Sequence, residues 1–428
     1  MRLEVGSILI KDVQFGDKTE VKNGVLYVNK DEIAKIAGDD DRIKSVEVYL
    51  ARPGESVRIL PVKDVVEPRV KVDGPGGIFP GFMSNVDQVG SGTTHVLKGA
   101  AVVTTGKIVG FQEGIIDMKG VGAEYTPFSK TNNVVVKVEP IDSIKQHEHE
   151  VVVRMAGLRA SNYLGLAGKN VKPDEVKVYE TKPLLEQVNQ YPNLPKVVYV
   201  YMLQTQGLLH NTFYYGVDVR QIVPTFMYPT EVFDGAIISG NCVSACDKNP
   251  TYIHCNSPVI EDLYAEHGKT INFLGCVITN ENVTLMDKER SSNMTAKLVG
   301  FLGADAAIIS EEGFGNPDAD LVMNCNKIEG QGIKTVLITD EYAGQDGASQ
   351  SLADSTPLGN ACVTAGNANE VVTLPPMDTV IGYPETANVI AGGWEGSLHA
   401  DGSITAEIQV ITSATNELGF GYLTAKGL

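Results

Sequence analysis

One short segment concentrates the residue types that do chemistry. Residues 239–255 read SGNCVSACDKNPTYIHC and contain Cys242, Cys246, His254 and Cys255. Thiols and an imidazole this close together suggest metal binding or thiol chemistry, since deprotonated sulfur is both a metal ligand and a nucleophile. Three residues separate the first two cysteines and eight separate the next two. Because this spacing is not that of a zinc knuckle, we expect thiol chemistry and no metal.

Each neighbour of Cys242 has a functional and a packing interpretation. His254 could carry out acid-base steps because an imidazole titrates near neutral pH, or it could be a histidine without a role. Cys246 and Cys255 are possible pocket thiols, with burial in a core as the alternative. His210 follows a predicted strand and could face the same cleft.

Other motifs are missing. No Gly-Lys pair has the glycine that a Walker A loop needs five positions upstream, and no G-x-G-x-x-G follows a predicted strand. No nucleotide cofactor is therefore predicted. The run HEHE at 147–150 is not H-E-x-x-H, and we expect it on an exposed polar strand edge rather than in a metal site.

The elements that position these residues fall into two predicted domains. Residues 1–180 form a β-rich domain, since short Val- and Ile-rich runs alternate there with Gly, Pro, Asn and Asp turns. Residues 181–428 form an α/β domain, since strands and helices alternate, which predicts a mostly parallel sheet. The predicted strands are 196–203, 235–240, 270–278, 306–310 and 334–339, and the predicted helices are 258–267, 286–302 and 318–329.

This arrangement predicts where a site would lie. Ligands in open α/β sheets bind beyond the carboxyl ends of the strands, and Cys242 directly follows the predicted strand 235–240. The acidic segments 311–315 and 340–344 follow two other strands and should reach the same edge. Their carboxylates could line the cleft, or they could simply cap the following helices.

Composition limits the class of protein. The 428 residues include 35 Lys plus Arg and 53 Asp plus Glu, a net charge of −18, which disfavours binding to nucleic acid or to an anionic membrane surface. Residues 1–241 hold 27 basic and 29 acidic side chains, whereas residues 242–428 hold 8 and 24. The charged N-terminal stretch is not a secretory signal and no apolar run could span a bilayer, so we expect a cytoplasmic protein with reduced cysteines.

Long motifs carry a resemblance to a known family. The segments GNCVSACDKNPT (240–251), KERSSNMTAKL (288–298), ISEEGFGNPDADLVMNC (309–325) and ITDEYAGQDGASQSLAD (338–354) resemble the proprotein subunit of component B of the glycine, sarcosine and betaine reductases. So do ARPGESVRI (51–59), GAAVVTTGKIVGFQEGIIDM (99–118) and GAEYTPFSK (122–130) in the N-terminal half. The resemblance covers essentially the whole chain.

The resemblance implies self-cleavage before a cysteine, here at the Asn241-Cys242 bond, with Cys242 becoming a pyruvoyl group. The residue type fits this chemistry, since a thiolate can attack the preceding carbonyl and form a thioester. β-Elimination then leaves dehydroalanine, which hydrolyses to a ketoacyl group with loss of ammonia. Only Cys, Ser or Thr carries the heteroatom that must leave.

The family's reaction further implies a Schiff base between the pyruvoyl group and the substrate amine, reductive deamination, and release of acetyl phosphate. The implied partners are a selenocysteine-containing subunit of component B, the component A selenoprotein, component C and the thioredoxin system. Glycine and sarcosine, as primary and secondary amines, can condense with a ketone, whereas betaine cannot. Two other classes stay open: a thiol or metal-binding protein with intact cysteines, and a non-catalytic scaffold.

Overall fold

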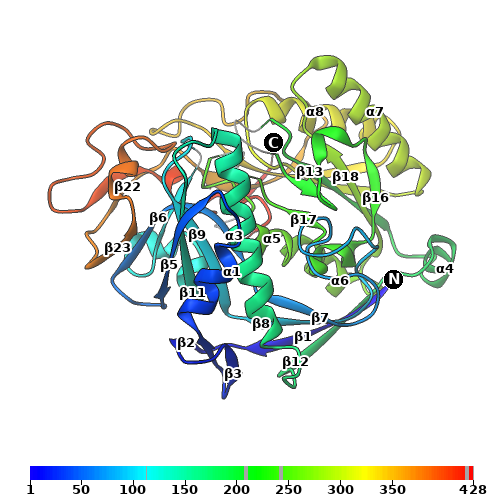
Figure 1. Cartoon of the computed structure of the whole chain (residues 1–428). Coiled ribbons are helices and arrows are strands. Elements are labelled where there is room, and N and C mark those ends of the chain that lie inside the picture. The colour runs from blue at the N-terminus through cyan, green and yellow to red at the C-terminus, as the bar shows by residue number, and fades with distance from the viewer. Residues whose placement is uncertain (112, 207–210, 241–243, 420–423, 428) are drawn as a thin grey trace.

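The computed structural model describes residues 1–111, 113–206, 211–240, 244–419 and 424–427 (Figure 1). Among these residues, strands form one six-stranded sheet, one seven-stranded sheet and several smaller ones, with helices packed on them. The predicted α/β class is confirmed. No helix in the described part of the chain combines the length and the apolar character that crossing a membrane requires.

Strands dominate the first part of the chain, as predicted. The main sheet has the order β10-β6-β9-β11-β5. A four-stranded sheet, β12-β1-β8-β7, and a small sheet, β2-β4-β3, lie beside it. The elements of this part are β1 (Arg2–Leu9), β2 (Asp12–Phe15), β3 (Glu20–Lys22), β4 (Val25–Val28), α1 (Lys30–Ala37), β5 (Ile43–Ala51), β6 (Val57–Val66), β7 (Arg69–Asp73), β8 (Gly92–Lys98), β9 (Ala100–Gly106), β10 (Gly114–Asp117), α2 (Val121–Glu124), η1 (Pro127–Lys130), β11 (Asn132–Pro140) and β12 (Glu175–Glu180).

The prediction of a strand edge at 147–150 is wrong. These residues open α3 (Gln146–Leu166), a long helix that lies across the six-stranded sheet (Figure 1). Its β-branched run at 151–153 has strand propensity, but both Val152 and Val153 are buried against neighbouring elements. Tertiary burial therefore outweighs local propensity. His147 is exposed while Glu150 is buried, so the two ends of the run face different surroundings.

The seven-stranded sheet is the α/β part of the fold. Its order is β16-β18-β13-β19-β20-β21-β25, and the five central strands are parallel while the two edge strands are antiparallel. Side chains of α4, α7 and α8 pack on one face and those of α6 on the other. The elements are α4 (Leu184–Gln190), β13 (Lys196–Leu203), η2 (Val219–Gln221), β16 (Thr225–Met227), η3 (Pro229–Asp234), α6 (Pro258–Glu266), β18 (Asn272–Asn280), α7 (Leu285–Phe301), β19 (Ala306–Ser310), α8 (Asn316–Glu329), β20 (Lys334–Glu341), β21 (Ala361–Asn367) and β25 (Thr424–Gly427).

The predicted strand 235–240 does not belong to this sheet. Only Ile237–Ile238 (β17) is extended, and it pairs with β14 (Phe213–Tyr214) in a separate antiparallel sheet with β15 (Val217–Asp218). The strand is short because the backbone N–H of Ser239 donates to Thr251 Oγ1, 3.2 Å away, instead of to a neighbouring strand. Strands of the parallel sheet nevertheless come from both sides of the 241–242 bond.

The last part of the chain returns to the first. Strand β23 (Thr379–Gly382) pairs in parallel with β6 and is the sixth strand of the six-stranded sheet. The remaining elements are β22 (Val371–Leu374), η4 (Pro384–Asn388), β24 (Ile404–Glu407) and η5 (Ile408–Val410). The division into domains at residue 180 stays a prediction.

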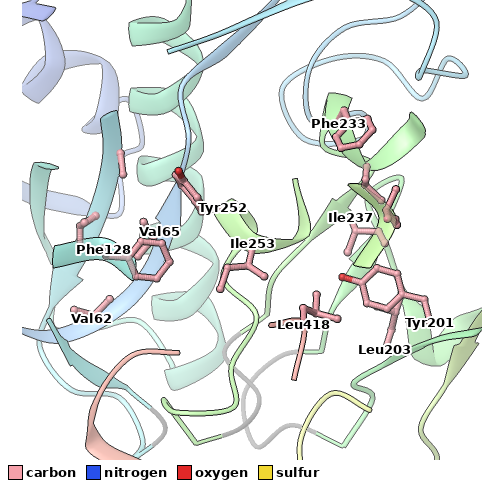
Figure 2. Close-up of a cluster of buried hydrophobic side chains, with 14 of the residues drawn as sticks. Val62, Val65, Phe128, Tyr201, Leu203, Phe233, Ile237, Tyr252, Ile253 and Leu418 are labelled. Atoms are coloured by element: carbon pink, nitrogen blue, oxygen red, sulfur yellow. The ribbon is translucent and has the colours of Figure 1, made fainter. Parts of the chain in front are cut away.

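A short helix links the two large sheets. Ile253 of α5 (Thr251–His254) lies between side chains of β6 and η1 on one side and of β13 and β17 on the other (Figure 2). Tyr252 packs edge-on against Phe128, with the ring centroids 5.4 Å apart. One continuous hydrophobic core therefore holds α5, and with it His254, in a fixed position.

Candidate active site

Buried carboxylates gather at the carboxyl ends of the parallel strands. Glu281 directly follows β18, Glu311 and Glu312 follow β19, and Asp340 lies near the end of β20. From β13 the chain continues to β18 on one side of it and then crosses to β19 on the other side. The gap between β13 and β19 is therefore the switch point at which open α/β sheets bind ligands. Gln204, just beyond β13, donates its backbone N–H to Glu312 Oε2 at 2.8 Å. Glu312 therefore occupies the switch point.

His254 is brought to this point by α5. Its Nδ1 lies 2.6 Å from the hydroxyl of Tyr201, and its Nε2 lies 3.3 Å from Glu312 Oε1. All three side chains are buried. The Nε2 and Oε1 atoms are close but lack the alignment of a hydrogen bond, and neither has another partner among the described residues. Both are therefore available to a small polar ligand.

The buried carboxyl groups around His254 lie in surroundings that disfavour their charged form. Glu281 Oε1 accepts the backbone N–H of Glu312 at 2.8 Å, and burial followed by the charge of Glu312 raises the pKa of Glu281 well above its usual range. Burial, followed by the charge of Asp247, does the same to the pKa of Glu417. No Lys or Arg of the described residues forms an ion pair with these side chains. The site therefore favours a bound cation or retained protons.

A second group of side chains lies beside the first. The rings of Phe314 and Tyr342 stack, which joins the loops after β19 and β20. The Tyr342 hydroxyl lies 3.3 Å from Cys246 Sγ and donates to Asp247 Oδ2 at 3.3 Å. Burial, followed by the charge of Asp247, raises the pKa of the Cys246 thiol well above its usual range. The two acidic loops thus line the site. Asp318, in the first turn of α8, accepts the backbone N–H of Gly315 and so caps this helix.

The other predicted site residues have different outcomes. Cys255 is buried among apolar side chains that include Phe79, Leu158 and Ile238, and burial raises the pKa of its thiol to about 12, as expected for a packing residue. His210, Asn241 and Cys242 lie outside the described residues.

The residues that flank the predicted cleavage bond are fixed. Ser239, Gly240 and Ser244 are all buried. Ser239 is held through Thr251, whose hydroxyl donates to Asp64 Oδ2 at 2.7 Å. Ser244 Oγ donates to Gln409 Oε1 at 3.3 Å.

Several residues of the site were not singled out from the sequence. Asp247 adjoins Cys246, and Glu281 follows a predicted strand, so both carried a positional signal. Tyr201 lies inside a strand, and Glu417 comes from the tail of the chain, where no pattern indicated the site. These two are brought in only by the tertiary fold.

Comparisons with known proteins show similarity along the whole chain. Residues 1–426 match the family described as glycine/sarcosine/betaine reductase component B subunits. The chain is 70% identical to the glycine reductase complex component B subunits alpha and beta of Peptoclostridium acidaminophilum and 68% identical to those of Acetoanaerobium sticklandii, covering 100% of each chain. It is 60% identical to the sarcosine reductase complex component B subunit alpha of P. acidaminophilum, again over 100% of both chains. No solved structure gives a significant match.

A match of this extent defines the class of protein. The chain belongs to the family of glycine/sarcosine/betaine reductase component B subunits.

Proposed function

We propose that this chain is the substrate-binding subunit of a glycine reductase component B and that it takes part in the reductive deamination of glycine. The observation that carries this proposal is the identity of 70% and 68% to two glycine reductase component B subunits over their whole lengths. The sarcosine reductase subunit is less similar, at 60%. Products of the complete reaction would be acetyl phosphate and ammonia.

The proposed maturation step is cleavage of the Asn241-Cys242 bond. The Cys242 thiolate attacks the Asn241 carbonyl, and the peptide bond becomes a thioester with a free amine on residue 242. β-Elimination breaks the Cβ–S bond and leaves the sulfur as a thiocarboxylate on residue 241. Hydrolysis of the resulting enamine releases ammonia and leaves a pyruvoyl group on residue 242. Buried flanking residues on both sides, Ser239, Gly240 and Ser244, fit a group that must be held away from bulk water. When present, the pyruvoyl group supplies an electrophilic ketone that condenses with an amine and withdraws electrons from its C–N bond.

His254 is the proposed proton-transfer residue. Tyr201 fixes the ring through Nδ1, so that Nε2 is directed toward Glu312 Oε1. A buried histidine with one satisfied and one free nitrogen suits the transfer of a proton to or from a small ligand. Glu312 would attract the ammonium form of an amine substrate, because the described residues place no Lys or Arg in an ion pair with it. Cys246 and Cys255, both buried thiols with raised pKa, take no acid-base role here.

The proposed reaction needs partners. A selenolate from a selenocysteine-containing subunit of component B would displace the amine and keep the carboxymethyl group. The component A selenoprotein, component C and the thioredoxin system would then complete the release of acetyl phosphate and restore the reductant. These partners are proposed because the chain belongs to a family of component B subunits, which are parts of a larger complex.

Sarcosine is the second candidate substrate. It is a secondary amine and can also condense with a ketone, and a sarcosine reductase subunit is 60% identical to this chain. Betaine, a quaternary ammonium, cannot condense and is the least suited of the three.

A reconstituted assay tests the proposal. The purified chain is combined with its partner components, and release of ammonia, methylamine or trimethylamine is measured with glycine, sarcosine and betaine in turn. We expect glycine to react fastest, and we expect Cys242→Ala to abolish the reaction while Cys325→Ala, which alters a buried thiol of α8, leaves it intact. Faster turnover of sarcosine would replace the proposed substrate, and an active Cys242→Ala variant would overturn the proposed chemistry.

A further inference from the structure

Three side chains with metal-ligating atoms meet beside the candidate active site. Cys246 Sγ and one carboxylate oxygen each of Asp247 and Asp340 all lie within 4.8 Å of one another. Cys246 and Asp247 belong to the turn that follows the predicted cleavage bond, and Asp340 comes from β20. All three side chains are buried.

Each carboxylate keeps a free oxygen. Asp247 Oδ2 accepts the hydroxyl of Tyr342, and Asp340 Oδ2 accepts the hydroxyl of Thr415 at 2.9 Å. The second oxygens, Asp247 Oδ1 and Asp340 Oδ1, have no hydrogen-bond partner in the described part of the chain. Asp247 is 0% exposed and Asp340 is 2% exposed, so bulk water does not satisfy these atoms either. An unpartnered buried carboxylate oxygen is costly, which indicates that something binds it.

Further negative groups surround the pair. Glu312 acts electrostatically on Asp247, and both Asp247 and Asp340 act on Glu417. These carboxylates come from four segments of the chain, and none of them pairs with a Lys or Arg among the described residues. A proton shared between Asp247 and Asp340 would relieve part of the repulsion, but it would give no role to the thiol that lies with them. A divalent cation uses all three groups.

Hydroxyl groups hold the three possible metal ligands in position. The Tyr342 hydroxyl reaches both Cys246 Sγ and Asp247 Oδ2 at 3.3 Å, and Thr415 holds Asp340. Hydroxyl donors of this kind fix metal-ligating side chains in place. A cavity of 240 Å³, lined in part by Tyr125, Glu370 and Thr415, borders the group at Thr415.

We propose that Cys246, Asp247 and Asp340 bind one divalent transition-metal ion, and that Zn²⁺ fits this donor set best. A thiolate ligand disfavours Mg²⁺ and Ca²⁺, whereas one sulfur and two oxygens suit zinc. The three ligand atoms lie within 4.8 Å of one another, and tetrahedral coordination places such atoms about 3.5 Å apart, so the side chains move inward only slightly when the ion binds. Binding releases the protons held by the thiol and the carboxyl groups. The bound ion would fasten the turn at 244–247 to the end of β20. Spacing alone indicated no metal, since the third ligand comes from a distant strand.

Metal titration of the full chain tests this site. The protein is treated with a chelator in a thiol-free reductant, and Zn²⁺ is then titrated against a chromophoric competitor. We expect one ion per chain, and we expect Cys246→Ser, Asp247→Asn and Asp340→Asn each to weaken binding at least about 100-fold, as expected for loss of one of three ligands. Cys325→Ser, a buried thiol outside the group, is the matched control and should bind as the unaltered chain does.

Cobalt spectroscopy tests the sulfur ligand on the unaltered chain itself, so this readout does not require a variant to fold. Co²⁺ bound to the unaltered chain should show a thiolate-to-cobalt charge-transfer band, and Cys246→Ser should lose that band. Zn²⁺ should also raise the thermal unfolding temperature of the unaltered chain and leave that of Asp340→Asn unchanged. Absence of stoichiometric Zn²⁺ binding, a Co²⁺ complex without the sulfur band, or equal binding by Cys246→Ser would each overturn the proposal.

Discussion

His254 is the single described residue on which the proposed chemistry depends most. It is buried, one ring nitrogen is fixed by Tyr201, and the other lies 3.3 Å from Glu312. A histidine that only filled space would not need one hydrogen-bonded ring nitrogen and one free ring nitrogen beside a carboxylate at a sheet's switch point. The arrangement therefore supports proton transfer rather than packing.

Replacing this histidine tests that role. We expect His254→Gln to lower turnover of the reconstituted enzyme by about 10²- to 10⁴-fold, the usual contribution of a general acid or base. Substrate binding should change much less than turnover. His399→Gln, which removes an exposed histidine near β24, is the control. Turnover within about twofold of the unaltered enzyme would show that His254 has no part in proton transfer.

At this scale the sequence predicted part of the site. His254 and Cys246 could be found because they lie close to Cys242 along the chain. Glu417 could not be found, because only the folding of the tail against the sheet brings it near Asp247. Local spacing indicates neighbours along the chain, whereas a buried cluster is assembled by long-range contacts.

At the scale of elements, α5 connects the two large sheets. Ile253 is 0% exposed and lies between residues of β6 and β13 in one core (Figure 2). Because the same four-residue helix carries His254, packing of Ile253 also sets the position of the imidazole.

Truncating Ile253 should therefore affect both stability and activity. We expect Ile253→Ala to lower the free energy of unfolding by about 2–5 kcal/mol, the range for removing a buried aliphatic side chain. Val283→Ala, at a position 60% exposed, should change the free energy of unfolding by no more than about 0.5 kcal/mol. Urea unfolding measures both, and equal effects of the two substitutions would refute the linking role of α5.

Helix α3 carries a histidine that should make stability depend on pH. Burial, followed by the positive charge of Lys63, lowers the pKa of His149 from 6.5 to about 4. The unfolded chain binds this proton near pH 6.5 and the folded chain only near pH 4. The part of the free energy of unfolding that depends on neutral His149 is therefore fully present above the unfolded pKa of 6.5, and it is lost as the pH falls toward about 4.

Substitution of His149 should reduce that acid sensitivity. Between neutral pH and about pH 4, we expect the free energy of unfolding of His149→Gln to fall by about 1 kcal/mol less than that of the unaltered chain. This value is reduced because the side chain is partly exposed. Urea unfolding at a series of pH values measures the difference. His147→Gln removes an exposed histidine from the same turn and serves as the control. An identical pH profile for His149→Gln and the unaltered chain would contradict the prediction.

Elements with strong local signals were predicted well, and those decided by tertiary contacts were not. Strands β13 and β19 have the predicted bounds, and α6 begins at Pro258 as predicted, after Ser257, whose side chain accepts the N–H of Ile260. The start of α3 was predicted as a strand edge, and the valine run 151–153 that follows has strand propensity although it is helical. Part of the segment 235–240 pairs with β14 in a different sheet. This pairing could not be predicted, because the sequence of β14 gave no signal of a strand.

At the scale of the whole molecule, the two sides of the 241–242 bond are interleaved. The seven-stranded sheet takes β13 and β16 from before the bond and β18 to β21 from after it. The six-stranded sheet takes β23 from the last part of the chain (Figure 1). Thr379 of this strand pairs with Val57 of β6. Separating the two parts would break ladders in both sheets.

The proposed cleavage products should therefore stay together. Residues 1–241 have a net charge of −2 and residues 242–428 have −16, so free fragments would separate on native ion exchange. We expect a single native peak that contains both fragments and resolves into two only in denaturant. Two native peaks with different charge would contradict the interleaved arrangement.

The intact mass of the denatured protein tests the central claim most directly. We predict two species, residues 1–241 and residues 242–428, with the second lighter than encoded because its first residue has lost the nitrogen and sulfur of cysteine and gained an oxygen. Borohydride should add two hydrogens to that species alone, and Cys242→Ala should give one uncut chain of 45.9 kDa. An uncut chain in protein that is active with glycine, or a second fragment that begins with an unmodified cysteine, would contradict the claim.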